Sequence, residues 1–468
     1  MSMAANSAGG RKAFCGSGSG LRRRGGEILP QNRLLWLGVL VLAGMLLNCS
    51  GDRSSAGKRR LLYWSANNQS EITLAQQVVA EWNRLHPDIQ VVHQPVPEGE
   101  SSEEVILAAV VGKTTPDVYS NMWPGDIEFY VRANRLVALD QFADFDSVAR
   151  DRYDPEVLEQ MRSPNGHVYQ LLWKTNPILL LYNKKLFEEA GFAAPPRTYS
   201  GYLQAGARIC QDFNGDGYYD RWLGVTDIRA RWRDRLFDFY PLYIAASGGR
   251  TFFDRGKLSI DTTAARKVFA FFQEIFRRRY FPKMVPSGGR DPFLAGQVAS
   301  RITGPWEIAR LERLKPPGFQ YGFSSIPVPD DYHGPLYTYG NPKSIVVFWT
   351  TKHPRAAWRF AAFLISRTSD YRLLSVASQL PYRKNLLTDP LFKDYFDSHP
   401  MMIQFARQAR YTRAEDATPA LKEIFDAISQ EFEACVFYAA KTPRQAVLDM
   451  MDRIRLLVPE SGGTGERK

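Results

Sequence analysis

The sequence predicts an α/β protein with two or three lobes, and three observations carry this prediction. Its 468 residues exceed the roughly 100–200 residues of one ordinary domain. Strand and helix patterns alternate over residues 61–120, an order typical of parallel strands covered by helices. The 28 Phe, 22 Tyr and 10 Trp residues can fill more than one core, and only four Cys residues are present, which excludes a disulfide-rich scaffold.

Residues 1–48 have the pattern of a signal peptide. Six basic residues and one acidic residue come before or beside an uncharged apolar run of 14 residues, Leu34 to Leu47. At about 1.5 Å per residue, a helix of this length spans roughly 21 Å, short of the ~30 Å hydrocarbon core of a membrane. A basic stretch followed by an apolar run of about 7–15 residues is typical of a secretory signal. We therefore expect the chain to be exported.

Cys49 directly follows the apolar run and resembles the processing site of a bacterial lipoprotein, where the thiol is lipidated and becomes the first residue. Asn48 departs from the small residue usual at that position, and ordinary signal cleavage nearby is the alternative. Residues 49–60 are polar and predict a tether. The resemblance implies a membrane-anchored lipoprotein that faces the periplasm or the cell exterior.

The positive charge does not predict a nucleic-acid partner. The net charge is +11, and loss of the leader lowers it to +6. The densest basic run, residues 229–235, holds a single aromatic residue and is interrupted by Asp234. Nucleic-acid surfaces combine a basic stripe with interleaved aromatic side chains, which this run lacks. We expect a solvated helix face or a docking patch there.

The first elements of the mature chain have marked ends. Residues 61–64 and 89–92 are short apolar strands, and the stretch 72–85 between them carries apolar residues at helical spacing. Pro87 ends this helix, because the residue before a proline avoids the helical region. Residues 103–111 predict a second helix, and residues 114–119 a turn that enters a third strand.

Further elements follow along the chain without a tandem repeat. We expect helices at 126–133, 186–190, 199–212, 262–279, 308–314, 354–365 and 421–437. We expect strands near 167–171 and at 177–182, 299–302, 321–326 and 344–349.

An ordered series of short motifs over residues 60–455 carries a family resemblance. The series is LLYWSANN (61–68), EWNRLHPDIQV (81–91), AAVVGKTTPDVYS (108–120), ANRLVALDQF (133–142), LLLYNKKLFEEAGFAAPPRTYSGY (179–202), FLAGQVASRITGPWEI (293–308), YGFSSIPVP (321–329), NPKSIVVFWTTKHPRAAWRFAAFLIS (341–366), LPYRK (380–384) and KTPRQAVLDM (441–450). Together these motifs resemble the extracellular solute-binding proteins of bacterial ABC transporters, family 1, the maltose-binding-protein-like type.

The resemblance implies a two-lobed periplasmic-binding-protein-like II fold, with hinge strands between the lobes and the ligand in the interlobe cleft. Lobe 1 is expected at 60–168 and 333–385, lobe 2 at 169–332 and 386–458, and a tail at 459–468. The implied function is capture of a carbohydrate, an oligosaccharide, outside the cytoplasmic membrane and its delivery to an ABC permease. We expect a monomer that needs no cofactor.

Sugar recognition needs aromatic rings for the apolar faces of a pyranose, and planar polar groups for its hydroxyls. Candidates of both kinds lie where the family places its binding loops. Tyr182 and Trp306 match family positions that stack on sugar. Asp126 could instead cap a helix, Trp306 could be a core residue, and Arg383 could form a structural salt bridge. The full set of candidates is Trp64, Asn68, Asn121, Trp123, Asp126, Trp173, Tyr182, Trp306, Tyr339, Asn341 and Arg383.

The loop 212–220 suggests one structural metal, calcium. Asp212, Asn214, Asp216 and Asp220, with the Tyr218 carbonyl, fit the first part of a calcium loop, although Leu223 stands where the bidentate Glu belongs. A polar turn explains the same residues, since Asn-Gly and Asp-Gly favour turns. Cys210 and Cys435 could pair in an oxidising compartment or remain buried thiols.

No enzyme motif is present in the mature chain. HExxH, CxxC, GxSxG and a P-loop are all absent, and the six histidines lack metal-ligand spacing. We therefore expect a receptor and not an enzyme. Two alternatives remain at this stage. One is a surface-tethered enzyme that cleaves glycosides, because a pair of acids is set by the fold and not by sequence spacing. The other is a receptor for a non-sugar solute, such as a polyol or a glycerol-phosphate.

Overall fold

The computed structural model describes residues 59–97, 101–254, 257–284, 289–416, 418 and 420–458. The expected signal peptide (1–48), the lipidation site Cys49, the tether up to residue 58 and the tail 459–468 lie outside the described residues. Over the described ranges, no helix combines the length and the apolar character needed to cross a membrane.

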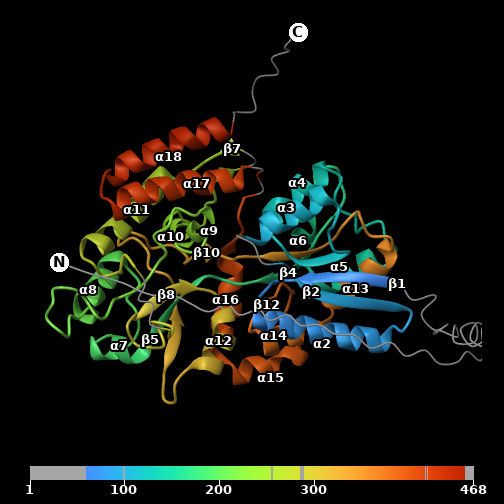
Figure 1. Ribbon diagram of the computed structural model, residues 1–468, viewed down its shortest axis with the longest axis horizontal. Coiled ribbons are helices and arrows are strands. Elements are labelled where there is room, and N and C mark those ends of the chain that lie inside the picture. The colour runs from blue at the N-terminus through green and yellow to red at the C-terminus, as the bar shows by residue number, and fades with distance from the viewer. Residues whose placement is uncertain are drawn as a thin grey trace, which may run out of the picture. The chain divides into compact units, whose positions relative to one another are not determined.

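A six-stranded sheet forms the first lobe, in the order β12-β4-β11-β3-β1-β2 (Figure 1). β1 pairs in parallel with β2 and β3, whereas β11 runs antiparallel to β3 and β4. The alternating side chains of β1 serve two cores: Tyr63 packs into one with Trp82, and Trp64 into another with Tyr119. The strands are β1 (Arg59–Ser65), β2 (Ile89–Pro95), β3 (Val118–Met122), β4 (Leu171–Thr175), β11 (Lys343–Val347) and β12 (Leu380–Pro381).

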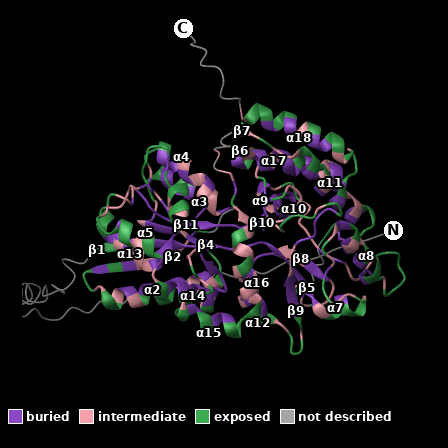
Figure 2. Cartoon of the chain, turned by 180° about the vertical axis from the view of Figure 1, so that it is seen from behind, coloured by how far each residue is buried: buried purple, intermediate pink, exposed green. Residues whose placement is uncertain are grey.

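Helices cover both faces of this sheet. In Figure 1, α2 and α14 lie below it, and α3 and α4 lie above it. Figure 2 shows these helices buried on their inner faces and exposed on their outer faces, as amphipathic helices are. The helices of this lobe are α2 (Gln69–Leu85), α3 (Ser102–Gly112), η1 (Pro124–Asp126), α4 (Ile127–Arg132), α5 (Phe145–Arg152), α6 (Pro155–Gln160), α13 (Pro354–Leu364) and α14 (Arg367–Ala377).

The second lobe combines a small antiparallel sheet, in the order β8-β5-β9, with a helical cluster. α10, α11, α17 and α18 bury one large aromatic core, in which Tyr240, Phe272 and Phe432 have almost no exposure. Its strands are β5 (Leu179–Asn183), β6 (Phe253–Asp254), β7 (Lys257–Leu258), β8 (Ser300–Thr303), β9 (Tyr321–Ser324), β10 (Thr338–Tyr339) and β13 (Thr412–Arg413). Its helices are α7 (Lys184–Glu189), α8 (Tyr199–Ile209), α9 (Trp232–Arg235), α10 (Phe239–Ala246), α11 (Thr262–Arg277), α12 (Trp306–Leu314), α15 (Pro390–Ser398), α16 (Pro400–Gln408), η2 (Ala409–Tyr411), α17 (Leu421–Phe432), the π-helix η3 (Glu433–Phe437) and α18 (Pro443–Leu457).

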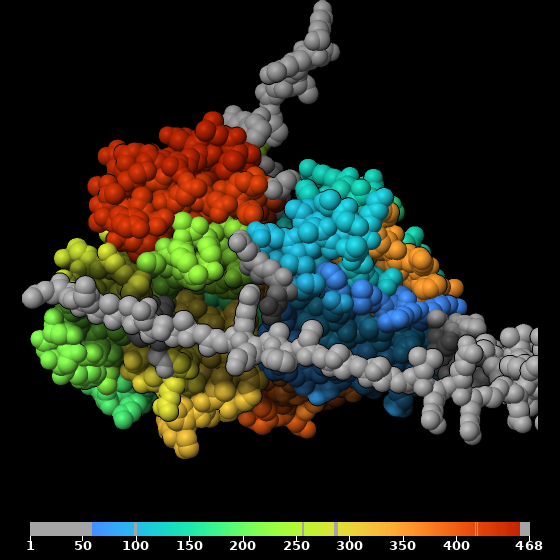
Figure 3. Space-filling model, viewed as in Figure 1, coloured from blue at the N-terminus to red at the C-terminus, as the bar shows by residue number. Residues whose placement is uncertain are grey.

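Each lobe draws on distant parts of the chain. In Figure 3 the orange segment that contains α13 lies beside the blue and cyan segments, and the red C-terminal helices lie beside green ones. β4 continues within a few residues into β5, so the chain passes here from the large sheet to the small one.

The position of β4 differs from the expected division of the chain. The strand expected near 167–171 lies at Leu171–Thr175, and it pairs inside the large sheet although 169 was the expected start of lobe 2. The reason is packing: Leu171 and Trp173 are buried in the same core as Leu61 and Tyr63. Cys210 and Cys435 are both buried free thiols, so these two residues form no disulfide.

Candidate functional site

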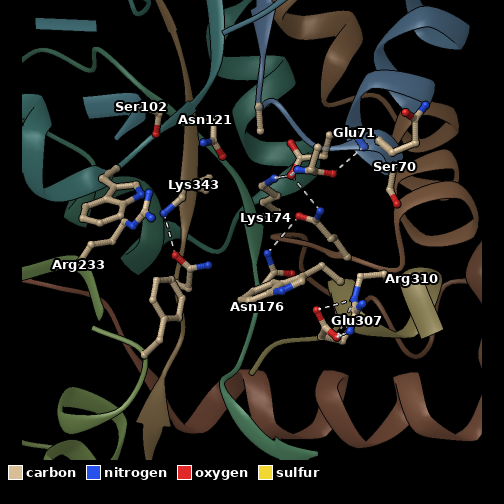
Figure 4. A pocket seen from close by; sticks show the side chains of 18 of the residues that line it. Ser70, Glu71, Ser102, Asn121, Lys174, Asn176, Arg233, Glu307, Arg310 and Lys343 are labelled. Carbon is tan, nitrogen blue, oxygen red and sulfur yellow. Dashed lines mark hydrogen bonds and ion pairs between the residues drawn. The ribbon is translucent and has the colours of Figure 1, made fainter. Parts of the chain in front are cut away.

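A cavity of about 400 Å³ lies where the ends of the large sheet's strands meet α12 and the segment around α9 (Figure 4). Both lobes contribute polar and aromatic side chains to it. The wall next to the large sheet is Ala66, Asn68, Gln69, Ser70, Glu71, Ser102, Glu103, Asn121, Trp123, Lys174, Asn176, Asn341, Lys343 and Gln379, and the wall from the second lobe is Arg233, Phe237, Trp306, Glu307, Arg310 and Arg313.

A hydrogen-bonded chain of side chains forms the inner wall. Asn68 caps α2, and its side-chain oxygen accepts from the Glu71 amide at 3.0 Å. Glu71 Oε1 then accepts from Lys174 Nζ at 2.7 Å and from Gln379 Nε2 at 2.9 Å. Asn176 Nδ2 donates to Gln379 Oε1 at 3.1 Å, which extends the chain toward the second lobe.

Two oxygens of this wall have no hydrogen-bond partner among the described residues. They are Glu71 Oε2 and Asn176 Oδ1, and both are buried. Burial raises the pKa of Glu71, but the charge of Lys174 and hydrogen bonds from Lys174, Gln379 and Asn68 lower it more, so its pKa lies below the ordinary value. The carboxylate therefore stays ionised and can accept only. A buried acceptor without a donor is unfavourable by about 1–3 kcal/mol, so a ligand donor there would be stabilising.

Lys343 lies beside the first aromatic ring of the cavity. Its ammonium is 4.3 Å from the centre of the Trp123 ring and donates to Asn341 Oδ1 at 2.7 Å. Burial lowers the pKa of Lys343 to about 8, because its neighbouring carboxylates only partly offset the loss of water. Trp123 in turn meets Trp232 of α9 edge to face, with ring centres 5.3 Å apart.

Trp306 supplies the second indole ring and is half-buried. Its ring folds back over Gly304, where a Cβ atom would lie only 2.1 Å from the indole, and meets Phe237 edge to face at 6.1 Å. Next to it, Glu307 accepts from Arg310 at 2.9 Å, and both belong to a cluster of ion pairs with Asp291 and Arg301. This cluster holds the first turn of α12 in place, and with it Trp306.

Comparison with known proteins decides the family. The family model of the bacterial extracellular solute-binding proteins matches residues 66–370. The chain belongs to the bacterial extracellular solute-binding proteins. A maltotriose-binding protein of Pyrococcus abyssi is 22% identical over 408 residues, 85% of this chain and 81% of the relative.

Solved structures agree in fold with this solute-binding protein. An uncharacterized protein of Listeria monocytogenes EGD-e has a TM-score of 0.69 and 25% identity, and the match covers 86% of this chain and 100% of that one. The maltose/maltodextrin-binding domain of Bdellovibrio bacteriovorus, bound to maltotriose, has a TM-score of 0.68 and 18% identity over 85% of this chain and 99% of that one. The predicted two-lobed fold and family are confirmed. Members of the family bind solutes outside the cytoplasm and generally need no cofactor.

Five of the predicted ligand residues of this solute-binding protein line the cavity. They are Asn68, Asn121, Trp123, Trp306 and Asn341. They come from the ends of β1 and β3, from the start of α12 and from the loop before β11, as expected for binding loops at strand ends.

The other six candidates lie outside this cavity, for reasons of packing. Trp64, Trp173 and Tyr182 are built into the cores on either side, and Lys174 Nζ lies 4.4 Å over the Trp173 ring. Tyr339 is buried and donates to Glu415 at 2.9 Å. Arg383 donates to the buried Asp370 at 2.7 Å, which is the structural salt bridge we gave as its alternative. Asp126 lines a neighbouring cavity and does not cap α4.

Several lining residues were not predicted, chiefly Glu71, Lys174, Asn176, Lys343, Glu307 and Arg310. Two carried a local signal. Glu71 stands three residues after Asn68, the spacing of a capping box, and Lys174 is a charge inside an apolar strand. A buried lysine needs a partner, and that partner, Glu71, is 103 positions away in the sequence.

The loop 212–220 is held by its own backbone. Asp212 accepts from the amides of Gly215 at 2.7 Å and Gly217 at 2.8 Å, and Asp216 Oδ1 accepts from Tyr218 at 2.8 Å. Across the described ranges, no group of three or more His, Cys, Asp or Glu side chains is placed to hold a metal ion. The loop therefore has the hydrogen bonds of the polar turn, and the calcium hypothesis gains no support from the structure.

Proposed function

We propose that this chain is the substrate-binding component of an ABC importer, and that it captures a carbohydrate, an oligosaccharide, in the 400 Å³ cleft and delivers it to the permease. Family membership supports solute capture for transport. Support for a saccharide comes from the lining of the cleft, from the relative described as maltotriose-binding, and from the similar maltose/maltodextrin-binding domain bound to maltotriose.

One observation carries the choice of a saccharide: acceptor oxygens without donors lie in the same cleft as a half-buried indole ring. Glu71 Oε2 and Asn176 Oδ1 each lack a donor among the described residues, and sugar hydroxyls are donors. The ring of Trp306 offers an apolar face of the kind that stacks on a pyranose. Asn68, Asn121 and Asn341 add planar amides that can both donate and accept.

We further propose that the protein is exported, anchored through a lipid on Cys49, monomeric, and without catalytic turnover. Family membership supports this last point, because the matching family model is that of solute-binding proteins. Replacement of Cys49 by Ser should release the protein from the membrane fraction in cells. Retention of that variant in the membrane fraction would remove the lipid anchor from the proposal.

A thermal-shift screen tests the function. The probes are mono- and oligosaccharides, polyols and glycerol 3-phosphate, each followed by calorimetry on the hits. A saccharide that binds the native state and not the unfolded state should raise the melting temperature. At a concentration 100 times its Kd, it raises the free energy of unfolding by about 2.7 kcal/mol. A shift with glycerol 3-phosphate alone would favour the non-sugar alternative. Release of cleaved products from an oligosaccharide would favour the enzyme.

A further inference from the structure

A second cavity of about 230 Å³ lies next to the cleft, and Trp123 and Glu103 belong to the walls of both. It is built by both lobes: α3 and the segment after β3 supply one side, and Trp232 with the start of α17 supplies the other. A ligand that extends past Trp123 from the cleft would therefore reach this second cavity.

Its walls are aromatic. Trp123, Trp232 and Tyr130 are buried, with exposed fractions of 4%, 9% and 3%, whereas Phe129 at the edge is 44% exposed. Trp123 and Trp232 meet edge to face, with an interplanar angle of 74°. Indole and phenol rings attract a cation that lies over their faces, and these side chains supply such rings on more than one side of the cavity.

Its charged groups are mostly acidic. Glu103, Glu104, Asp126 and Glu423 face one lysine, Lys422. Glu104 is the carboxylate that Lys422 contacts, at 3.0 Å. Glu103 accepts from its neighbour Ser102, and Asp126 makes no side-chain hydrogen bond or ion pair with any described residue. The cavity thus has more negative than positive groups.

The electrostatic state of Asp126 agrees with this excess. Burial, together with the charges of Glu103 and Glu415, raises the pKa of Asp126 to about 7, and Lys343 offsets this only in part. An additional cation near Asp126 would favour its ionised form. The cation of Lys343 is already engaged with Asn341 and the Trp123 ring.

We propose that this second cavity binds the protonated amino group of an aminated saccharide whose sugar ring lies in the adjacent cleft. The proposal rests on the proposed carbohydrate function and adds a substrate class to it. The ammonium would lie among the aromatic rings, where cation–π attraction contributes, and would donate to Asp126 and Glu103. A neutral hydroxyl in the same place would have no cation–π attraction, and its hydrogen bonds to these carboxylates would be weaker. The carboxylates here are not gathered as a set of metal ligands, which also favours an organic cation over a metal ion.

The test compares saccharides that differ only at one substituent. Calorimetry on the folded protein uses β-1,4-linked oligosaccharides of glucosamine, of N-acetylglucosamine and of glucose, at low salt and pH 7, where Asp126 can ionise. The amine form should bind at least ten-fold more tightly than the other two, and salt should weaken its binding alone. Equal affinities for the three forms would overturn the proposal while leaving a carbohydrate receptor. Absence of binding to any saccharide, in this series and in the wider screen, would overturn the proposed function itself.

Two variants locate the effect. D126N keeps the shape of the side chain but removes its charge, and should lower affinity for the amine form about ten-fold while leaving affinity for a neutral saccharide unchanged. D146N, at an exposed carboxylate on α5, is the matched control, and it should change neither the affinity for the amine form nor the affinity for a neutral saccharide. A thermal melt of each variant establishes that it is folded. An equal loss for amine and neutral saccharides in D126N would overturn the role of this cavity.

Discussion

At the residue scale, the position of Trp306 follows from its neighbours. Gly304 leaves room for the ring, Phe237 meets it at a right angle, and the ion pairs of Glu307 fix the turn below it. None of these contacts closes off the indole, which stays half-buried in the wall of the cleft. The ring is therefore available to a ligand without any rearrangement of a core.

Replacement of Trp306 by Ala should lower saccharide affinity ten-fold or more, because a stacked aromatic ring contributes about 0.5–1.5 kcal/mol beyond the apolar area that it buries. The melting temperature of the ligand-free protein should change by only a few degrees. W306F should keep most of the affinity, since it keeps a ring. Calorimetry and thermal melts measure both quantities, with Y218A as the control at a side chain that is 72% exposed. Unchanged affinity in W306A would remove Trp306 from the site.

A pH prediction follows from Asp126, which is surrounded by Glu103 of α3, Tyr130 of α4, Lys343 of β11 and Glu415. Its folded pKa of about 7 lies above the ordinary value near 3.8, so the native state holds a proton between these values that the unfolded chain releases. This group therefore makes the protein less stable as pH rises from about 4 to about 7.

D126N removes that dependence. The free energy of unfolding of D126N minus that of wild type should be larger at pH 8 than at pH 5, by an amount on the order of 1–3 kcal/mol. Urea denaturation at the two pH values measures it. For the control D146N, the difference in free energy of unfolding from wild type should be the same at pH 5 and at pH 8. A difference for D126N that stays constant with pH would contradict the raised pKa.

At the element scale, the N-cap residue of α2 contributes both to the stability of the helix and to the wall of the cleft. Asn68 caps the helix and lines the cleft, whereas Ser366 caps α14 of the same lobe through the Ser369 amide and does not line it. Both caps satisfy an amide that would otherwise lack a partner at the helix start. The two helices pack against each other, so their caps have similar surroundings but different access to the ligand.

N68A and S366A should each lower the free energy of unfolding by about 1 kcal/mol, the usual contribution of an N-cap. Only N68A should also weaken saccharide binding, by several-fold. Denaturant titration and calorimetry on the two proteins separate these effects. If S366A weakened binding as much as N68A, the loss would be a general effect of helix stability, and Asn68 would have no direct contact with the ligand.

Elements with local signals could be predicted, and elements defined by long-range packing could not. α2 was expected at 72–85 and runs from Gln69 to Leu85, because its spacing and Pro87 mark it. α10 was not expected: it is apolar on all sides and contains Pro241, so it has no period and carries a helix breaker. β4 begins at Leu171, where the strand expected near 167–171 ends, so the two ranges share one residue.

In the site, too, residues with a local signal could be predicted and residues placed by long-range packing could not. Aromatic and amide residues after strands could be recognised one at a time, and Asn68, Trp123 and Trp306 do line the cleft. The contact of Lys174 with Glu71 joins residues 103 positions apart, and only the folded sheet brings them together. Trp173, its neighbour, was expected at the ligand, but alternation along β4 turns it into the core.

At the scale of the whole molecule, two of the contacts that join the lobes beside the cleft involve Trp123 and Glu104 of the first lobe. Trp123 from the first lobe meets Trp232 from the second, and Lys422 of α17 contacts Glu104 of α3. Both lobes also supply walls of the cleft, so a ligand in it touches both. A ligand with contacts on both sides favours the closed arrangement over an open one by its difference in affinity.

Reversal of one bridging charge tests this link between closure and affinity. K422E places a like charge against Glu104, which should populate more open arrangements and raise the radius of gyration of the ligand-free protein in small-angle X-ray scattering. Affinity for a neutral saccharide should fall about two- to ten-fold, because the observed Kd rises as the binding-competent fraction falls. Saturating saccharide should restore the wild-type radius. K393E reverses a comparable exposed pair within α15 and should alter neither quantity. If K422E lost affinity with no change in radius, Lys422 would act by contact or local charge, and closure would not depend on this pair.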